Sequence, residues 1–155
     1  MRHRKSGRKF GRQTSQRHAL RRHVVCALFA HGRITTTVAR AKDFRPFAEK
    51  MITIAKRGAA ARAAGDDVIA LNAYRRLLKD LHDETTVARL VESIAPIYAD
   101  RPGGYTRMLR HAHGRLGDNA PTVVFELVDR ELIDADEAEE PTTEETQETA
   151  ETASA

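Results

Sequence analysis

Residues able to carry catalytic or metal chemistry are few in this sequence and poorly grouped. Cys26 has His23 and His31 nearby, but a lone thiol in an apolar run is more typical of a buried small residue than of a nucleophile or metal ligand. His111 and His113 alternate along a predicted strand and would supply at most half of a metal site. The sequence holds no glycine-rich phosphate loop, nucleophile elbow or paired-cysteine zinc spacing. We therefore expect no catalytic residue, no metal, no cofactor and no small-molecule substrate.

Phosphate binding is the chemistry that the sequence supports, because its charge is strongly segregated. Residues 1–42 contain 12 Lys and Arg, four His and no acid. The formal charge of the whole chain is only +4, because residues 131–155 contain 10 acids and no base. The first 130 residues consequently carry a formal charge of +14, which favours a polyanionic partner such as nucleic acid.

The first 13 residues form a basic arm with little to fold around. Met1 and Phe10 are its only large apolar residues, so we expect the arm to be disordered in the free protein. An arginine-rich start also suits an organelle transit peptide, but Gly7 and Gly11 break the amphipathic helix that such a peptide needs. The candidate phosphate-binding residues of the arm are Arg2, His3, Arg4, Lys5, Arg8, Lys9 and Arg12.

Apolar spacing predicts a helix and a strand directly after the arm. The helix is expected to begin after Thr14 and Ser15, which are good N-cap types, and Gly32 ends it. Residues 33–37 are rich in β-branched side chains and predict a short strand. The expected apolar stripe of the helix is Leu20, Val24, Ala27 and Leu28.

Two further helices are expected in the middle of the chain. The second helix starts at Val38, with a kink or break just before Pro46 and a soft link from residue 57 to 65. Asp66 or Asp67 can cap the third helix. The expected apolar stripe of the third helix is Leu71, Tyr74, Leu78 and Leu81.

A fourth helix and a hairpin complete the predicted domain. The helix is capped near Asp83 and stopped by Pro96. Residues 105–112 and 122–128 are β-like runs, and the Gly, Asp, Asn and Pro between them predict an antiparallel hairpin. The expected apolar stripe of the fourth helix is Val87, Leu90, Val91 and Ile94.

These elements predict one small α+β domain over residues 14–130, with four helices around a three-stranded sheet. Residues 1–13 are the arm, and residues 131–155 are predicted to be a disordered acidic tail. That tail either solvates passively or transiently covers the arm. A single cysteine rules out an intrachain disulfide, and no apolar run is long enough to span a membrane, so we expect an intracellular protein.

The domain offers two further sets of candidate binding residues. Arg17, Arg21 and Arg22 fall away from the apolar stripe of the first helix, where they either continue the basic surface of the arm or form an ordinary solvated face. Arg107 is a candidate for phosphate contact on the first strand of the hairpin. Its neighbours Tyr105 and Arg110 are candidates as well, although a tyrosine at a strand start is more often a packing residue than a base-stacking one.

Five segments, in this order and with compatible spacing, resemble the bacterial large-subunit ribosomal protein family number seventeen. The resemblance extends from Met1 to about Asp129 and leaves only the acidic tail outside it. The segments are MRHRKSGRKFGR (1–12), ITTTVARAK (34–42), ITIAK (52–56), GGYTR (103–107) and GDNAP (117–121) followed by ELV (126–128).

The resemblance implies a structural protein of the large ribosomal subunit, in the cytoplasm, with no catalytic residue and no cofactor. Its implied partners are large-subunit ribosomal RNA and neighbouring ribosomal proteins, and it would support subunit assembly and translation. An RNA-processing enzyme would need a pocket with convergent acids or a cofactor motif, and the sequence offers neither. A DNA-binding protein is compatible with the charge alone, and association with large subunits rather than with DNA would separate these two classes.

Overall fold

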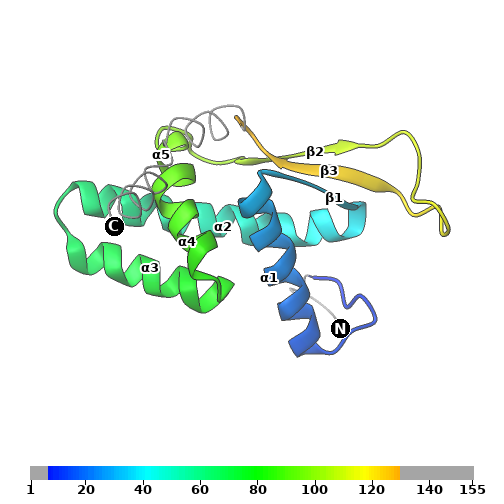
Figure 1. Ribbon diagram of the computed structural model, residues 1–155, viewed down its shortest axis with the longest axis horizontal. Coiled ribbons are helices and arrows are strands. Elements are labelled where there is room, and N and C mark those ends of the chain that lie inside the picture. Colours follow the sequence, from blue (N-terminus) through cyan, green and yellow to red (C-terminus); the bar gives the residue numbers. More distant parts are fainter. Residues whose placement is uncertain (1–6, 130–155) are drawn as a thin grey trace, which may run out of the picture.

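Four helical segments and three strands follow one another along residues 7–129, the part of the chain that the computed structural model describes (Figure 1). The predicted α+β class is confirmed for these residues, while the predicted disordered tail at 131–155 lies outside them. Helices α4, η1 and α5 are consecutive and form one segment. The elements are α1 (Thr14–His31), β1 (Arg33–Thr37), α2 (Val38–Ala63), α3 (Asp67–Leu81), α4 (Glu84–Arg89), η1 (Leu90–Ile94), α5 (Ala95–Ile97), β2 (Thr106–Arg110) and β3 (Thr122–Leu127).

The three strands form an antiparallel sheet in the order β1-β3-β2. Strands β2 and β3 are the predicted hairpin, and β1 pairs with the other edge of β3. One row across the sheet joins Ile34, Phe125 and Met108, and its side chains pack in or against the core. The next row joins Arg33, Glu126 and Arg107 and points to the opposite face, because successive side chains of a strand alternate.

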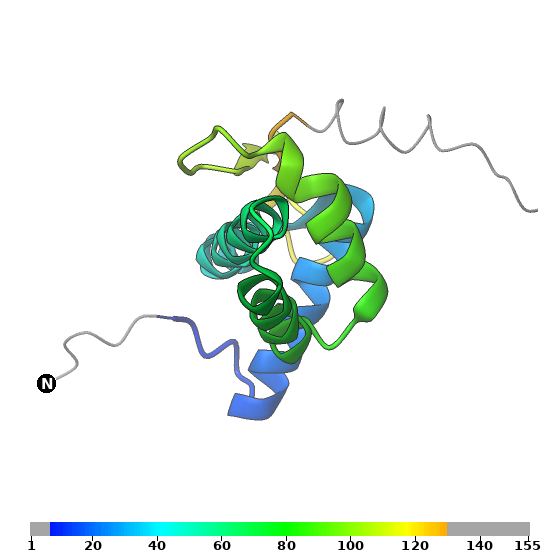
Figure 2. The same cartoon turned by 90° about the vertical axis from the view of Figure 1, so that its left-hand side faces the viewer.

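The helices lie on one side of the sheet in Figure 1, and not around it as predicted. Helices α1 and α2 make the main contacts with the strands. Helix α3 packs on α2, and α4 packs on α1 and α3 (Figure 2). The sheet therefore keeps one face for the core, while exposed Thr35 and Leu109 mark the other.

Large side chains from several elements meet in one core. Phe29 of α1, Phe44 of α2, Phe125 of β3 and Tyr98 beyond α5 are at most 1% exposed. Each such burial contributes roughly 1.5–3 kcal/mol. The stripe predicted for the fourth helix is confirmed, with Val91 half-buried beside three fully buried members, Val87, Leu90 and Ile94.

Helix α2 runs unbroken from Val38 to Ala63, so the break at Pro46, one of the two expected outcomes, is wrong. Proline removes the donor that would bond to the carbonyl of Lys42. Both residues are exposed, and water can replace that donor on the solvent side of a helix. The cost of the proline is thereby small enough for the packed helix to continue.

The soft link expected from residue 57 to 65 is also wrong, because most of this Ala-rich stretch belongs to α2. Its small residues let α3 approach closely. A Cβ atom at Gly58 would lie 2.9 Å from the Cβ of Ala73 in α3. The chain leaves the helix at Ala64 and turns at Gly65, whose φ of +83° suits glycine.

The start of α1 and the buried face of the helix differ from the prediction, whereas its end agrees. Gly32 adopts the left-handed conformation with φ of +65° and ends the helix as expected. The N-cap is Gln13 rather than Thr14 or Ser15, and it makes no side-chain capping bond. Of the predicted stripe only Leu28 is fully buried; the buried residues of α1 are Val25, Leu28 and Phe29.

The apolar stripe of α3 is rotated from the prediction. Leu77 and Leu81 are buried, whereas Leu71 is 48% exposed and Leu78 is only partly covered. Close packing through Ala73 decides which face of the helix meets α2. Because leucines lie on several sides of α3, the sequence alone does not show which side of the helix is buried.

Pro96 lies inside the last helical segment and does not stop it. In the π-helical turn η1, the backbone N–H of Ala95 donates to the carbonyl of Leu90, five residues back. This change of register comes directly before the proline, whose missing donor it accommodates. The helix ends at Ile97, one residue after the predicted stop, with Tyr98 as its C-cap.

We predict that Gly58→Leu lowers the free energy of unfolding by about 1–3 kcal/mol, because the new side chain must push α2 and α3 apart. Urea denaturation followed by circular dichroism measures this loss. Ala60→Leu is the matched control, since Ala60 is exposed on the same helix and should change stability by less than about 0.5 kcal/mol. Equal stability of the two variants would contradict close packing at Gly58.

Candidate nucleic-acid interface

The described part of the arm, residues 7–13, lies against the first turns of α2. The ring of Phe10 packs on Phe44 with 5.6 Å between centroids. The backbone N–H of Arg8 donates to Asp43 Oδ1 at 2.9 Å. These contacts fix part of the arm, in contrast to the expectation that all of it is disordered in the free protein. Four predicted binding residues, Arg2, His3, Arg4 and Lys5, lie outside the described residues.

A shallow groove of about 200 Å³ separates the arm from α1, and we call it the arm groove. Arg8, Arg17 and Arg21 line it. The Arg21 guanidinium lies 4.1 Å above the ring of Phe47, and Arg17 Nη2 donates to Thr14 Oγ1 at 3.0 Å. The Nε atoms of both α1 arginines are buried without a hydrogen-bond partner among the described residues. The groove is thus lined by three arginines, which suit an anionic ligand.

The other predicted residues of the arm and α1 divide into exposed and internal ones. Lys9 and Arg12 are exposed and have no acidic partner among residues 7–129. Arg22 Nε donates to the carbonyl of Asp80 at 3.2 Å, near the end of α3. Arg22 therefore ties α1 to α3 in addition to any role at the surface.

The hairpin residues predicted to bind RNA have different surroundings. Arg107 is exposed but paired with Glu126 at 2.7 Å, and Arg33 approaches the same carboxylate at 3.6 Å. Arg110 is exposed, with no acidic partner in the described part of the chain. Tyr105 is 3% exposed, so its ring offers no free face to a base in this conformation.

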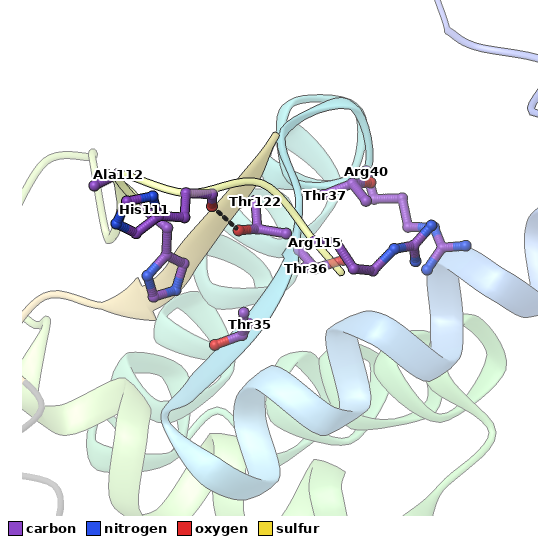
Figure 3. Close-up of a pocket in the computed structure, with 9 residues that line it drawn as sticks. Thr35, Thr36, Thr37, Arg40, His111, Ala112, Arg115 and Thr122 are labelled. Carbon is purple, nitrogen blue, oxygen red and sulfur yellow. Dashed lines mark hydrogen bonds between the residues drawn. The ribbon is translucent and has the colours of Figure 1, made fainter. Parts of the chain in front are cut away.

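A groove of about 570 Å³ lies between the end of the sheet and the hairpin loop (Figure 3). Arg40 of α2 and Arg115 of the loop lie at one end of this sheet-end groove, and His111 lies at the other. Arg115 donates to Asp118, which lowers the pKa of that carboxyl to about 2, so both groups are charged at neutral pH and compensate each other. Arg40 has no acidic partner among the described residues.

A third groove, of about 400 Å³, lies between α2, α3 and the turn before β2, and we call it the α2 groove. Lys50 and Arg57 come from α2 and Arg76 from α3. All three are exposed, and none has an acidic partner within residues 7–129. Sequence reasoning missed this site. The seven-residue spacing of Lys50 and Arg57 was a usable signal, whereas the approach of Arg76 depends on the packing of α3.

All eight aromatic rings of the chain lie within the described residues, and none is exposed. Phe10 and Phe47 are partly covered, the first by Phe44 and the second by Arg21. A protein surface that reads unpaired bases commonly stacks them on exposed aromatic rings. This surface instead presents guanidinium, ammonium and hydroxyl groups, which suit phosphate and ribose.

A family model described as ribosomal protein L17 matches residues 20–128, well over half of the chain. The chain belongs to the ribosomal protein L17 family. Large ribosomal subunit protein bL17 of Syntrophotalea carbinolica is 48% identical over 132 residues, covering 85% of this chain and 77% of that protein. The Thermus thermophilus protein of the same name is 48% identical over 129 residues, covering 83% of this chain and 100% of the relative. The Clostridium botulinum protein of the same name is 48% identical over 121 residues, covering 78% of this chain and 96% of the relative.

The L17 family consists of structural ribosomal proteins and not of enzymes, so the resemblance seen in the sequence and the expectation of a non-enzymatic protein are confirmed. The local chemistry of the thiol agrees with this. Burial raises the pKa of Cys26, with a smaller contribution from Asp83, which makes the thiol a poor nucleophile at neutral pH. Within residues 7–129 no three His, Cys, Asp or Glu residues are grouped to hold a metal ion, and no helix is long and apolar enough to cross a membrane.

We predict that Phe10→Ala releases the arm of this L17-family protein from α2, because the ring contact with Phe44 is lost. The amide of Arg8 should then exchange hydrogen markedly faster, since its bond to Asp43 depends on the same placement. Hydrogen exchange followed by NMR measures this amide directly. Amides in the middle of α2 serve as the internal control and should keep their protection. An unchanged exchange rate at Arg8 would show that the ring does not hold the arm.

Proposed function

We propose that this L17-family protein binds large-subunit ribosomal RNA through one basic surface formed by the arm and α1. The observation that carries the proposal is the attachment of the arm to α2 by Phe10 and Arg8, which brings Arg8 into one groove with Arg17 and Arg21, while Lys9 and Arg12 of the same arm remain exposed. The arm (1–13) would anchor the globular domain (14–130) to RNA, with the acidic tail (131–155) outside the contact.

Phosphate neutralisation supplies the binding energy in this proposal. Each cation that meets a phosphate releases condensed counterions, so affinity falls steeply with salt and depends little on sequence. The guanidinium groups of Arg17 and Arg21 along the arm groove would orient the contact, because a guanidinium offers a planar fork to phosphate oxygens. Arg2, His3, Arg4 and Lys5 would extend the same contact toward the start of the chain.

The remaining predicted residues take smaller parts. Arg107 shares Glu126 with Arg33, so this row contributes about one net positive charge to the outer face of the sheet. Arg110 is available for phosphate contact, whereas Tyr105 supports the fold. Neighbouring large-subunit proteins are the second class of partner, and the place of action is the ribosome in the cytoplasm, where the protein would support subunit assembly and translation.

The test compares two charge-matched pairs of substitutions in the full chain. We predict that Lys9→Gln with Arg12→Gln lowers the affinity for purified large-subunit ribosomal RNA and reduces the slope of log affinity against log salt by about 2, one for each lost phosphate contact. The control, Arg62→Gln with Lys79→Gln, removes one Arg and one Lys from exposed sites outside the arm groove and should leave the slope unchanged. Filter binding at several salt concentrations gives both values.

The proposal is wrong about the arm if the Lys9 and Arg12 variant keeps both its affinity and its salt slope. Cell fractionation adds an independent test of the partner. The intact protein should sediment with large subunits, and recovery with nucleoid DNA instead would point to a DNA-binding role.

A further inference from the structure

The α2 groove is cationic because Glu49, the one acid that lines it, is paired with Arg45 of the same helix. Glu49 Oε1 accepts from Arg45 Nε at 2.9 Å and from Thr106 Oγ1 at 3.0 Å. Lys50, Arg57 and Arg76 have no such partner among residues 7–129. The rim of the groove therefore carries close to three uncompensated positive charges.

The wall of this groove is held rigidly. Lys56 Nζ donates to the carbonyl of Arg101 at 2.6 Å, lies 3.4 Å from Tyr105 Oη and stands 5.3 Å from the centroid of that ring. Arg101 is in turn paired with Asp129 at 2.8 Å. A Cβ atom at Gly103 would have no neighbour within 4 Å, so the backbone of the turn is open to close approach by a ligand.

The α2 groove continues the surface that begins at the arm. Asp43, Phe47, Lys50, Ile54 and Arg57 are spaced by four and three residues, which places them on one face of α2. Asp43 holds the arm, Phe47 lies beneath Arg21, and the last three line the α2 groove. In Figure 2 residues 7–13, drawn in dark blue, lie on the side of α2 and α3, away from α4. The stripe is about 20 Å long at 1.5 Å per residue.

We propose that the α2 groove binds the sugar–phosphate backbone of double-helical RNA, beside the RNA contact of the arm. This inference rests on the proposed function and adds both a site and a class of ligand. Lys50 and Arg57 lie seven residues apart on α2, about 10 Å at 1.5 Å per residue, and Arg76 faces them from α3, so the groove offers three cations to the evenly spaced phosphates of a duplex. The groove has no exposed Phe or Tyr ring, which is the usual platform for unpaired bases, so phosphate contact is the interaction that it offers most directly.

The experiment uses the full-length protein, an RNA duplex of about 16 base pairs, the length that other duplex-binding domains cover, and polyuridine as the unpaired ligand. Lys50→Gln with Arg57→Gln should reduce the salt slope for the duplex by about 2 and weaken duplex binding more than polyuridine binding. Arg62→Gln with Lys79→Gln is the control of equal charge. Both pairs are exposed, and circular dichroism with thermal melting verifies that each variant folds.

An unchanged affinity and slope for the duplex in the Lys50 and Arg57 variant would overturn the site. Equal loss for duplex and polyuridine would overturn the assignment to double-helical RNA. The arm variant, Lys9→Gln with Arg12→Gln, separates the two proposals. If it weakens RNA binding and the groove variant does not, only the α2 groove is refuted, whereas failure of both variants refutes the basic surface as a whole.

Discussion

Burial of one face of α2 is the interaction on which the rest of the structure depends. The helix packs against α1, α3, η1, α5 and all three strands. Phe44, Met51 and Ile52 fill the core, and the small side chains of Ala48 and Ala55 let neighbours approach. Because that face is fixed by packing, the direction of the opposite face is fixed as well. The cations on α2 are therefore positioned by apolar residues that are themselves buried in the core.

The same packing explains why charge can remain uncompensated at the surface. A free protein with cations on one side suffers self-repulsion, which its core must outweigh. Where a carboxylate lies close, as Glu126 does between Arg33 and Arg107, the protein partly cancels its own charge. Along α2, Glu49 cancels the charge of Arg45 and Asp43 accepts from the arm backbone, so Lys50 and Arg57 are left without an acidic partner among the described residues. The repulsion that remains favours a polyanion as partner.

Sequence patterns predicted the features that depend on local residue types and spacing, and missed those that depend on contacts between elements far apart in the chain. The first strand, the hairpin and the left-handed stop at Gly32 follow from local chemistry, and all three are observed. Neither Pro46 nor Pro96 ends its helix: the carbonyl that Pro46 leaves without a donor lies on the exposed side of α2, and the π-helical turn η1 accommodates Pro96. The basic arm was visible as a run of charge, but the α2 groove was not, since Arg76 reaches it only through the contact of α3 with α2.

The distribution of aromatic residues limits how such a surface can recognise RNA. Aromatic residues make up only 5% of the chain, and none of their rings is exposed. A core of this size needs those rings, as the contacts of Tyr98 with Tyr105 and of Phe10 with Phe44 illustrate. Recognition is left to cations and hydroxyls, which read the position of phosphates and ribose rather than base identity. In the proposed binding mode, selectivity would come from the shape of the folded RNA, because only a matching backbone could contact the arm and the α2 groove together.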